Sequence, residues 1–226
     1  MEAGTAVAEG IYRADKDAEV TVRPLADGGE GSVEALTAGM NGKTEHVSVT
    51  GPLGNTVEAS YGIIAETKTA IIEMAAAAGI TLLAEKDRNP LYTTTYGVGE
   101  LMQDAMKKGC RNFIVGIGGS ATNDGGVGML QALGYGFLDA DGKQVPYGAK
   151  GLALIEKITD DRVVPELKEC HFKVACDVAN PLCGEQGCSA VFGPQKGATP
   201  SMIAEMDEWL ARYAGLTKDK YPESDK

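Results

Sequence analysis

A glycine-rich segment that follows an apolar strand constrains this chain more than any other feature of its sequence. Residues 113–117 are almost purely apolar, which is typical of a central strand in a parallel sheet. Six of the thirteen residues from 116 to 128 are glycine, and a helical pattern follows them. Because glycine has no Cβ, backbone N–H groups in such a turn can approach an anion closely, and the next helix adds partial positive charge. The segment therefore predicts a phosphate or oxyanion site.

Short polar side chains supply further hydrogen-bond donors in this segment. We predict contacts with a phosphate or a substrate carboxylate from Gly118, Gly119, Ser120, Thr122, Asn123 and Gly125. The segment is not a Walker loop, because no Gly-Lys-Ser/Thr run is present. A tight strand-to-helix turn that binds nothing is the structural alternative.

A dinucleotide-binding turn is a rival interpretation of the same residues. Gly116, Gly118 and Ala121 satisfy the G-x-G-x-x-[GA] pattern, and Asp139 ends the next expected strand. Against it, Asp124 is a better helix start than Gly118, and Asp139 opens an ordinary turn sequence.

Three expected strands are each followed by a carboxylate, namely Asp27, Asp124 and Asp177. If the strands are parallel, their carboxyl ends meet at one edge of the sheet, where ligands bind in open α/β sheets. Each aspartate alone is also consistent with a helix cap or a turn. Together with the glycines, they favour a functional cleft.

Other polar turns add candidates. Asp27 and Glu30 share a glycine-rich turn. Their negative charges would repel phosphate unless a magnesium ion bridged the carboxylates and the phosphate. Lys196 precedes a helix and could neutralise a transferring phosphoryl group, although an ordinary surface lysine fits equally well. Thr94 lies in a run of three threonines before a helix, where one cap is expected and ligand contact is the weaker hypothesis.

The order of the elements predicts an α/β fold with a mixed, largely parallel sheet and flanking helices. A hairpin within residues 57–74 makes the sheet mixed. We expect strands at 19–25, 47–49, 57–64, 70–74, 113–117, 135–138 and 172–176. We expect helices near 3–11, 32–38, 75–78, 97–108, after Asp124, and from Thr199 to Gly215.

Composition limits the partners. The net charge of −11 disfavours nucleic acid, because phosphate backbones are repelled. No apolar run approaches the roughly 20 residues that span a bilayer, and no signal peptide opens the chain, so a cytoplasmic location is expected. Five cysteines without a C-x-x-C pair indicate reduced thiols rather than a disulfide framework or a zinc site.

Several stretches together resemble bacterial glycerate kinases of the glycerate 2-kinase type. They are PLADGGEGSVEAL, VTGPLGN, AIIEMAAAAGI, NPLYTTTYGVGEL, FIVGIGGSATNDGGVGMLQALG and VACDVANPLCGEQGCSAVFGPQKGA. The resemblance covers nearly the whole chain, in family order. It implies ATP-dependent phosphorylation of D-glycerate, with magnesium, on a two-lobed α/β fold.

The chain departs from that family in extent. Family members look considerably longer, begin with a strand and continue past the equivalent of Lys226. We therefore expect an internal fragment in which residues 1–45 begin the first lobe without its first strand. Residues 46–226 would form the second lobe, and the C-terminal remainder would be absent.

The roles are predicted as follows. Asp177 or Asp124 accepts the proton of the glycerate hydroxyl, with Asp177 preferred; Lys196 offsets negative charge; Asp27 and Glu30 reach magnesium. Thr94, Asn180 and Gln195 complete the substrate- or nucleotide-binding set. The alternatives are a binding-competent but inactive fragment and a dinucleotide-binding domain. The sequence does not choose between 2- and 3-phosphoglycerate. Exposed apolar surface at a missing strand also predicts self-association.

Overall fold

The computed structural model describes residues 2–22, 31, 33, 37 and 39–224, and a five-stranded sheet forms its centre. The strands of this sheet, in spatial order, are β1 (Lys43–Thr50), β2 (Thr56–Ile64), β3 (Thr69–Glu73), β4 (Asn112–Gly116) and β7 (His171–Ala175). β2 pairs antiparallel with β1 and β3, whereas β4 lies parallel to β3 and β7. The expected α/β fold with a mixed sheet is confirmed.

Helices lie before, between and after these strands along the sequence. They are α1 (Glu2–Ala14), α3 (Ala75–Ala78), α4 (Tyr96–Lys107), α5 (Val127–Ala132), α6 (Ala149–Leu152), α7 (Cys188–Phe192) and α8 (Pro200–Lys220). Short 3₁₀ turns are η1 (Ile80–Leu82), η2 (Glu85–Asp87), η3 (Pro165–Glu169), η4 (Pro194–Lys196) and η5 (Pro222–Ser224). Among the described residues, no helix is both long and apolar enough to cross a membrane.

The larger core cluster lies between the sheet and α4. Tyr61, Phe113 and Leu101 are fully or almost fully buried in it. Two glycines let α4 pack closely: a Cβ on Gly97 would collide with the Thr50 carbonyl, and one on Gly99 with the Met129 carbonyl of α5. α4 is therefore held against both the end of β1 and α5.

A second core cluster joins α8 to a small antiparallel pair of strands, β5 (Gly136–Leu138) and β6 (Lys157–Thr159). The strand expected at 135–138 thus exists, but it pairs outside the main sheet. α8 begins at Thr199 and Pro200 as expected. It does not end at Gly215, because Leu216 and Tyr221 beyond it still pack on this cluster.

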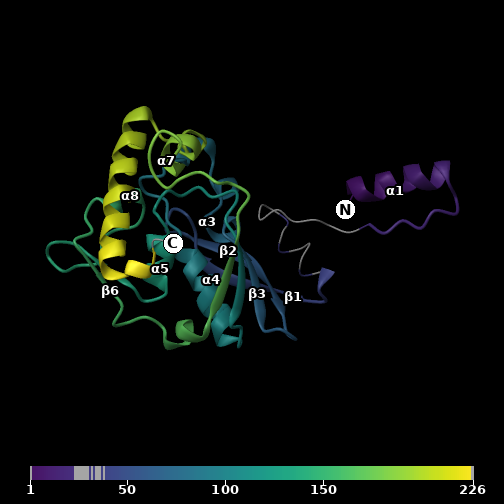
Figure 1. The fold of residues 1–226 in the computed structure, drawn as a ribbon, viewed down its shortest axis with the longest axis horizontal. Helices are drawn as coiled ribbons and strands as arrows, with labels where there is room; N and C mark the ends of the chain where they lie inside the picture. The colour runs from purple at the N-terminus through teal and green to yellow at the C-terminus, as the bar shows by residue number, and fades with distance from the viewer. Residues whose placement is uncertain (1, 23–30, 32, 34–36, 38, 225–226) are drawn as a thin grey trace.

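The N-terminal segment stands apart from the body of the molecule in Figure 1, with α8 on the opposite side. The helix expected near residues 3–11 is confirmed as α1. Residues 19–22 form no strand, so that expectation was wrong for its described part. Residues 23–25 lie outside the described residues, as do most of 32–38.

β7 is the edge strand of the sheet on the side of β4, and most of its side chains are exposed. Phe172 stacks on Phe113 of β4 with ring centroids 4.8 Å apart, yet it remains 41% exposed. Val174 on the same strand is 59% exposed. Apolar surface on β7 therefore lies open along the edge beside β4.

Candidate functional site

The glycine-rich loop begins at the carboxyl end of β4, as the sequence predicted, and its backbone is anchored to neighbouring turns. Ile80 donates from its N–H to the Gly119 carbonyl over 2.9 Å, and Ala121 donates to the Ala78 carbonyl over 2.8 Å. Gly119 adopts φ +69°, a left-handed conformation that favours glycine. The loop is thus a fixed turn, with Gly118 half-buried and Gly119 exposed.

Asp124 ties this loop to the threonine run. Its buried Oδ2 accepts hydrogen bonds from the N–H and the hydroxyl of Thr95, both 2.9 Å away, and from Gly128 N–H at 3.3 Å. Its Oδ1 accepts from Gly126 N–H at 3.1 Å. Burial raises the pKa of the Asp124 carboxyl, and these hydrogen bonds oppose the rise. Gly126, not Asp124, occupies the N-cap position of α5, so that part of the expectation was wrong.

Lys196 reaches the glycine-rich loop from η4. Its Nζ donates to Ser120 Oγ over 2.9 Å and to the Thr122 carbonyl over 2.5 Å. The side chain is 8% exposed, and desolvation lowers the pKa of its ammonium group to about 8. The structure therefore brings Lys196 to Ser120 and Thr122, which lie 76 and 74 positions away in the sequence.

Asn123 fixes the loop from the other side. Its buried amide donates to Ser189 Oγ of α7 over 2.9 Å and contacts Met206 Sδ of α8. Thr94 is also buried, and its hydroxyl accepts a hydrogen bond from Tyr96 N–H at 3.1 Å. Both side chains already have protein partners, so their geometry supports positioning of the loop.

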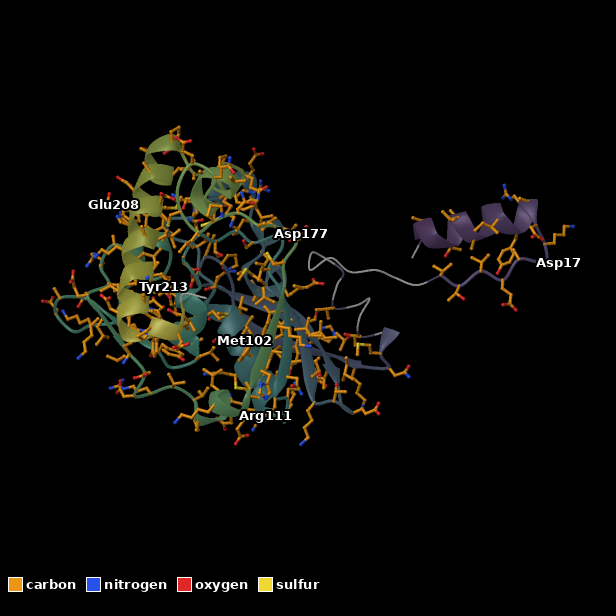
Figure 2. The ribbon with its side chains drawn as sticks, in the orientation of Figure 1. Asp17, Met102, Arg111, Asp177, Glu208 and Tyr213 are labelled. Carbon is orange, nitrogen blue, oxygen red and sulfur yellow. The ribbon has the colours of Figure 1, made fainter. Side chains whose placement is uncertain are left out.

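Asp177 lies beside the loop at the carboxyl end of β7. Gly116 of β4 pairs with Ala175 of β7, so Gly118 and Asp177 each follow that pair by two residues. Asp177 is exposed, and Figure 2 shows it between Glu208 of α8 and the N-terminal segment that carries Asp17. Because β4 and β7 are parallel, the segment that carries Asp177 leaves the same edge of the sheet as the glycine-rich loop.

The remaining candidates are dispersed. Asn180 is exposed and donates from its side chain to the Gln186 carbonyl over 2.9 Å, and Gln195 is exposed beside Lys196. Gly125 faces α8, where an added Cβ would lie 3.0 Å from Leu210, and it lines a cavity of about 410 Å³ away from Lys196.

Asp27 and Glu30 fall outside the described residues, so their predicted metal role has no structural counterpart here. Within the described part of the chain, no three His, Cys, Asp or Glu side chains gather as a metal site. Mg²⁺ usually takes one or two carboxylates together with phosphate oxygens.

The dinucleotide interpretation fails on topology. A dinucleotide fold needs the strand that ends at Asp139 beside β4 in a parallel sheet. β5 pairs with β6 instead, in a separate antiparallel sheet. Asp139 Oδ1 accepts from the N–H groups of Asp141 and Lys143, which makes it a turn residue.

Sequence reasoning missed Arg88. A Cβ on Gly197, the residue after Lys196, would collide with the Arg88 carbonyl, so Arg88 lies directly against the lysine turn. Its position immediately before the NPLYTTT stretch was the only signal in the sequence.

Comparison with known proteins decides the family. The sequence model described as "Glycerate kinase family" matches residues 1–225. The chain belongs to the glycerate kinase family. It is 50% identical over 218 residues to the glycerate kinase of Haemophilus influenzae and 49% identical over 217 residues to the glycerate 2-kinase of Escherichia coli K12. These alignments cover 96% of this chain but 58% and 57% of the two relatives.

A solved structure of the family has the same fold. The crystal structure described as glycerate kinase 2 from Salmonella typhimurium LT2 superposes with a TM-score of 0.88 at 49% identity. The superposition covers 95% of this chain and 57% of that one. This glycerate kinase family chain therefore spans a little over half the length of the relatives it matches.

Proposed function

We propose that this chain transfers the γ-phosphoryl group of ATP to a hydroxyl of D-glycerate. The observation that carries the proposal is the buried Lys196 ammonium, which holds Ser120 and Thr122 of the glycine-rich loop in a chain of the glycerate kinase family. Phosphoryl transfer needs positioning and charge stabilisation more than covalent chemistry. A fixed glycine-rich turn beside a lysine provides both.

We assign the proton-accepting role to Asp177. Its exposed carboxylate can reach a ligand, whereas the Asp124 carboxylate is 1% exposed and already accepts four hydrogen bonds. Asp124 acts in this scheme as a positioning residue that holds the loop. Lys196 stabilises charge on the transferring group, and the loop segment 118–123 orients the phosphate or the glycerate carboxylate.

The proposal includes a magnesium ion that carboxylates of the chain would bind. Asp27 and Glu30 would hold the ion, which would supply charge neutralisation at the phosphate oxygens when bound. The chain's own residues position the glycerate hydroxyl and accept its proton.

The experiment is a coupled assay of ADP release from ATP by this chain, with and without D-glycerate. Release that requires D-glycerate supports the proposal, and phosphorus NMR of the product distinguishes 2- from 3-phosphoglycerate. ADP release that does not depend on glycerate contradicts it.

A second candidate is a ligand-binding fragment without turnover. The observation that favours it is the extent of the chain, which covers 57–58% of its named relatives. Calorimetric binding of ATP or D-glycerate without ADP release would select this alternative.

Organisation, location and association complete the proposal. The expected boundary after residue 45 falls inside β1, so we place the second lobe from Lys43 and assign the preceding residues to the first. Free cysteines and a charge of −11 support a cytoplasmic protein without a nucleic-acid partner. The open edge of β7, with Phe172 and Val174 exposed, supports self-association, which light scattering over a concentration series tests.

A further inference from the structure

Arg88 is a second cation at the lysine turn. It follows η2, and its N–H donates to the Glu85 carbonyl at 3.3 Å. Gly197 adopts φ +90° and leaves no room for a side chain, because a Cβ there would collide with the Arg88 carbonyl and lie 3.2 Å from Arg88 Cβ. The backbone of Arg88 is therefore pressed against the residue that follows Lys196.

The guanidinium of Arg88 has no partner among the described residues. Its Nε is buried without a hydrogen-bond acceptor, and no described carboxylate lies within ion-pair distance. Arg88 as a whole is half-buried, but buried polar atoms such as its Nε are nearly always hydrogen-bonded in folded proteins. None of the described carboxylates pairs with this arginine, although the chain carries 32 Asp and Glu residues.

Lys196 also has no described carboxylate as an ion-pair partner. Its ammonium donates to a hydroxyl and a carbonyl, both neutral, and no described carboxylate lies within 4 Å. Desolvation accordingly lowers its pKa. Arg88 and Lys196 thus lie on adjoining turns without a carboxylate partner among the described residues, and their positive charge favours a bound anion.

We propose that Arg88 is an anion-binding residue of this site, where it holds an oxyanion of the bound ligand together with Lys196. The planar fork of a guanidinium matches the paired oxygens of a phosphoryl group or a carboxylate. The ligand is therefore either the phosphate chain of the nucleotide or the carboxylate of glycerate. The identity of this ligand rests on the proposed function, whereas the inference that Arg88 binds an anion does not.

The test compares Arg88→Gln, Arg88→Lys and a control, Lys86→Gln, with the unmodified chain. Lys86 lies two residues away in η2 and is exposed. Calorimetric titrations use three probes: tripolyphosphate, ATP and D-glycerate. We expect Arg88→Gln to weaken tripolyphosphate binding about tenfold, because it removes a charge-assisted contact. The tripolyphosphate affinity of Arg88→Lys should lie between those of Arg88→Gln and the unmodified chain, since lysine keeps the charge but lacks the planar guanidinium. Lys86→Gln should bind tripolyphosphate as tightly as the unmodified chain.

The two physiological probes identify the source of the anion. A selective loss of ATP affinity in Arg88→Gln places the guanidinium on the phosphate chain, and a selective loss of D-glycerate affinity places it on the carboxylate. Unchanged affinity for all three probes overturns the inference, as does an unmodified chain that binds none of them. Arg88-dependent tripolyphosphate binding without glycerate phosphorylation supports this inference and contradicts the proposed kinase activity. If Arg88→Gln does not fold, Arg88→Lys decides by the same titrations.

Discussion

The Lys196 ammonium donates a hydrogen bond to Ser120 Oγ over 2.9 Å, which joins η4 to the glycine-rich loop after β4. Lys196 is buried, so water screens this contact less than it would a surface contact. Two segments separated by 76 positions thus share one site. The charge state of this lysine should govern both activity and stability.

Lys196→Met should lower turnover about 10²- to 10³-fold, because it removes a charge aimed at the transferring group. In the unmodified chain, activity should also decline as pH rises through about 8, where Lys196 loses its proton. The coupled ADP assay between pH 6.5 and 9.5 measures both effects. A wild-type rate that stays flat across pH 8, with saturating substrates, would contradict the assignment.

The same pKa predicts an unusual pH dependence of stability. The folded value of about 8 lies below the unfolded value of 10.5, so the unfolded chain binds more protons between them. The free energy of unfolding should therefore rise as pH increases from about 8 to 10.5, by on the order of 3 kcal/mol from this group. Urea unfolding of the unmodified chain and of Lys196→Met isolates the contribution. The difference between the two should change over this pH range and stay constant below it.

Asp177→Asn and Asp124→Asn should separate chemistry from structure. Asp177 is exposed, so its substitution should leave the unfolding midpoint unchanged and reduce turnover by about 10²- to 10⁴-fold. Asp124→Asn should cost about 1–3 kcal/mol of stability, because an amide cannot accept all four hydrogen bonds. Full turnover in the folded Asp177→Asn protein would remove Asp177 from the proton-transfer step.

Two glycine substitutions should act in opposite directions. A Cβ on Gly128 would collide with Thr94 Oγ1, so Gly128→Ala should destabilise the protein by about 1–3 kcal/mol. Gly215 lies within α8 with nothing within 4 Å of the added atom. Gly215→Ala should therefore stabilise by up to about 1 kcal/mol. Urea unfolding of both variants measures the two changes in the free energy of unfolding. Equal changes in the two variants would refute the packing argument.

Much of the fold could be predicted because local patterns decided it. The alternating residues of β2 and the apolar run of β4 gave both strands correctly, and Thr199 with Pro200 marked the start of α8. The end of α8 could not be read locally, since packing of Leu216 overrides the glycine signal at Gly215. That β5 pairs with β6 outside the main sheet also could not be predicted from local sequence, because strand order depends on long-range contacts.

The candidate site was predictable in its parts but not in its connections. The glycine-rich loop, Asp124 and Lys196 each stood out by residue type. That Asp124 accepts hydrogen bonds from Thr95, and that Lys196 reaches Ser120, required the folded chain. Arg88 belongs to no motif and is noticed only through its missing partner.

The Asp124–Thr95 contact has a consequence for how this chain can diverge. Thr95 donates twice to the carboxylate, and its hydroxyl in turn accepts from Met129 N–H at 2.9 Å. A change at Asp124 leaves the Thr95 donors without their acceptor, and a change at Thr95 removes the hydroxyl donor from the buried carboxylate. Drift at these two positions should therefore be coupled, with one replacement surviving only when a compensating replacement accompanies it.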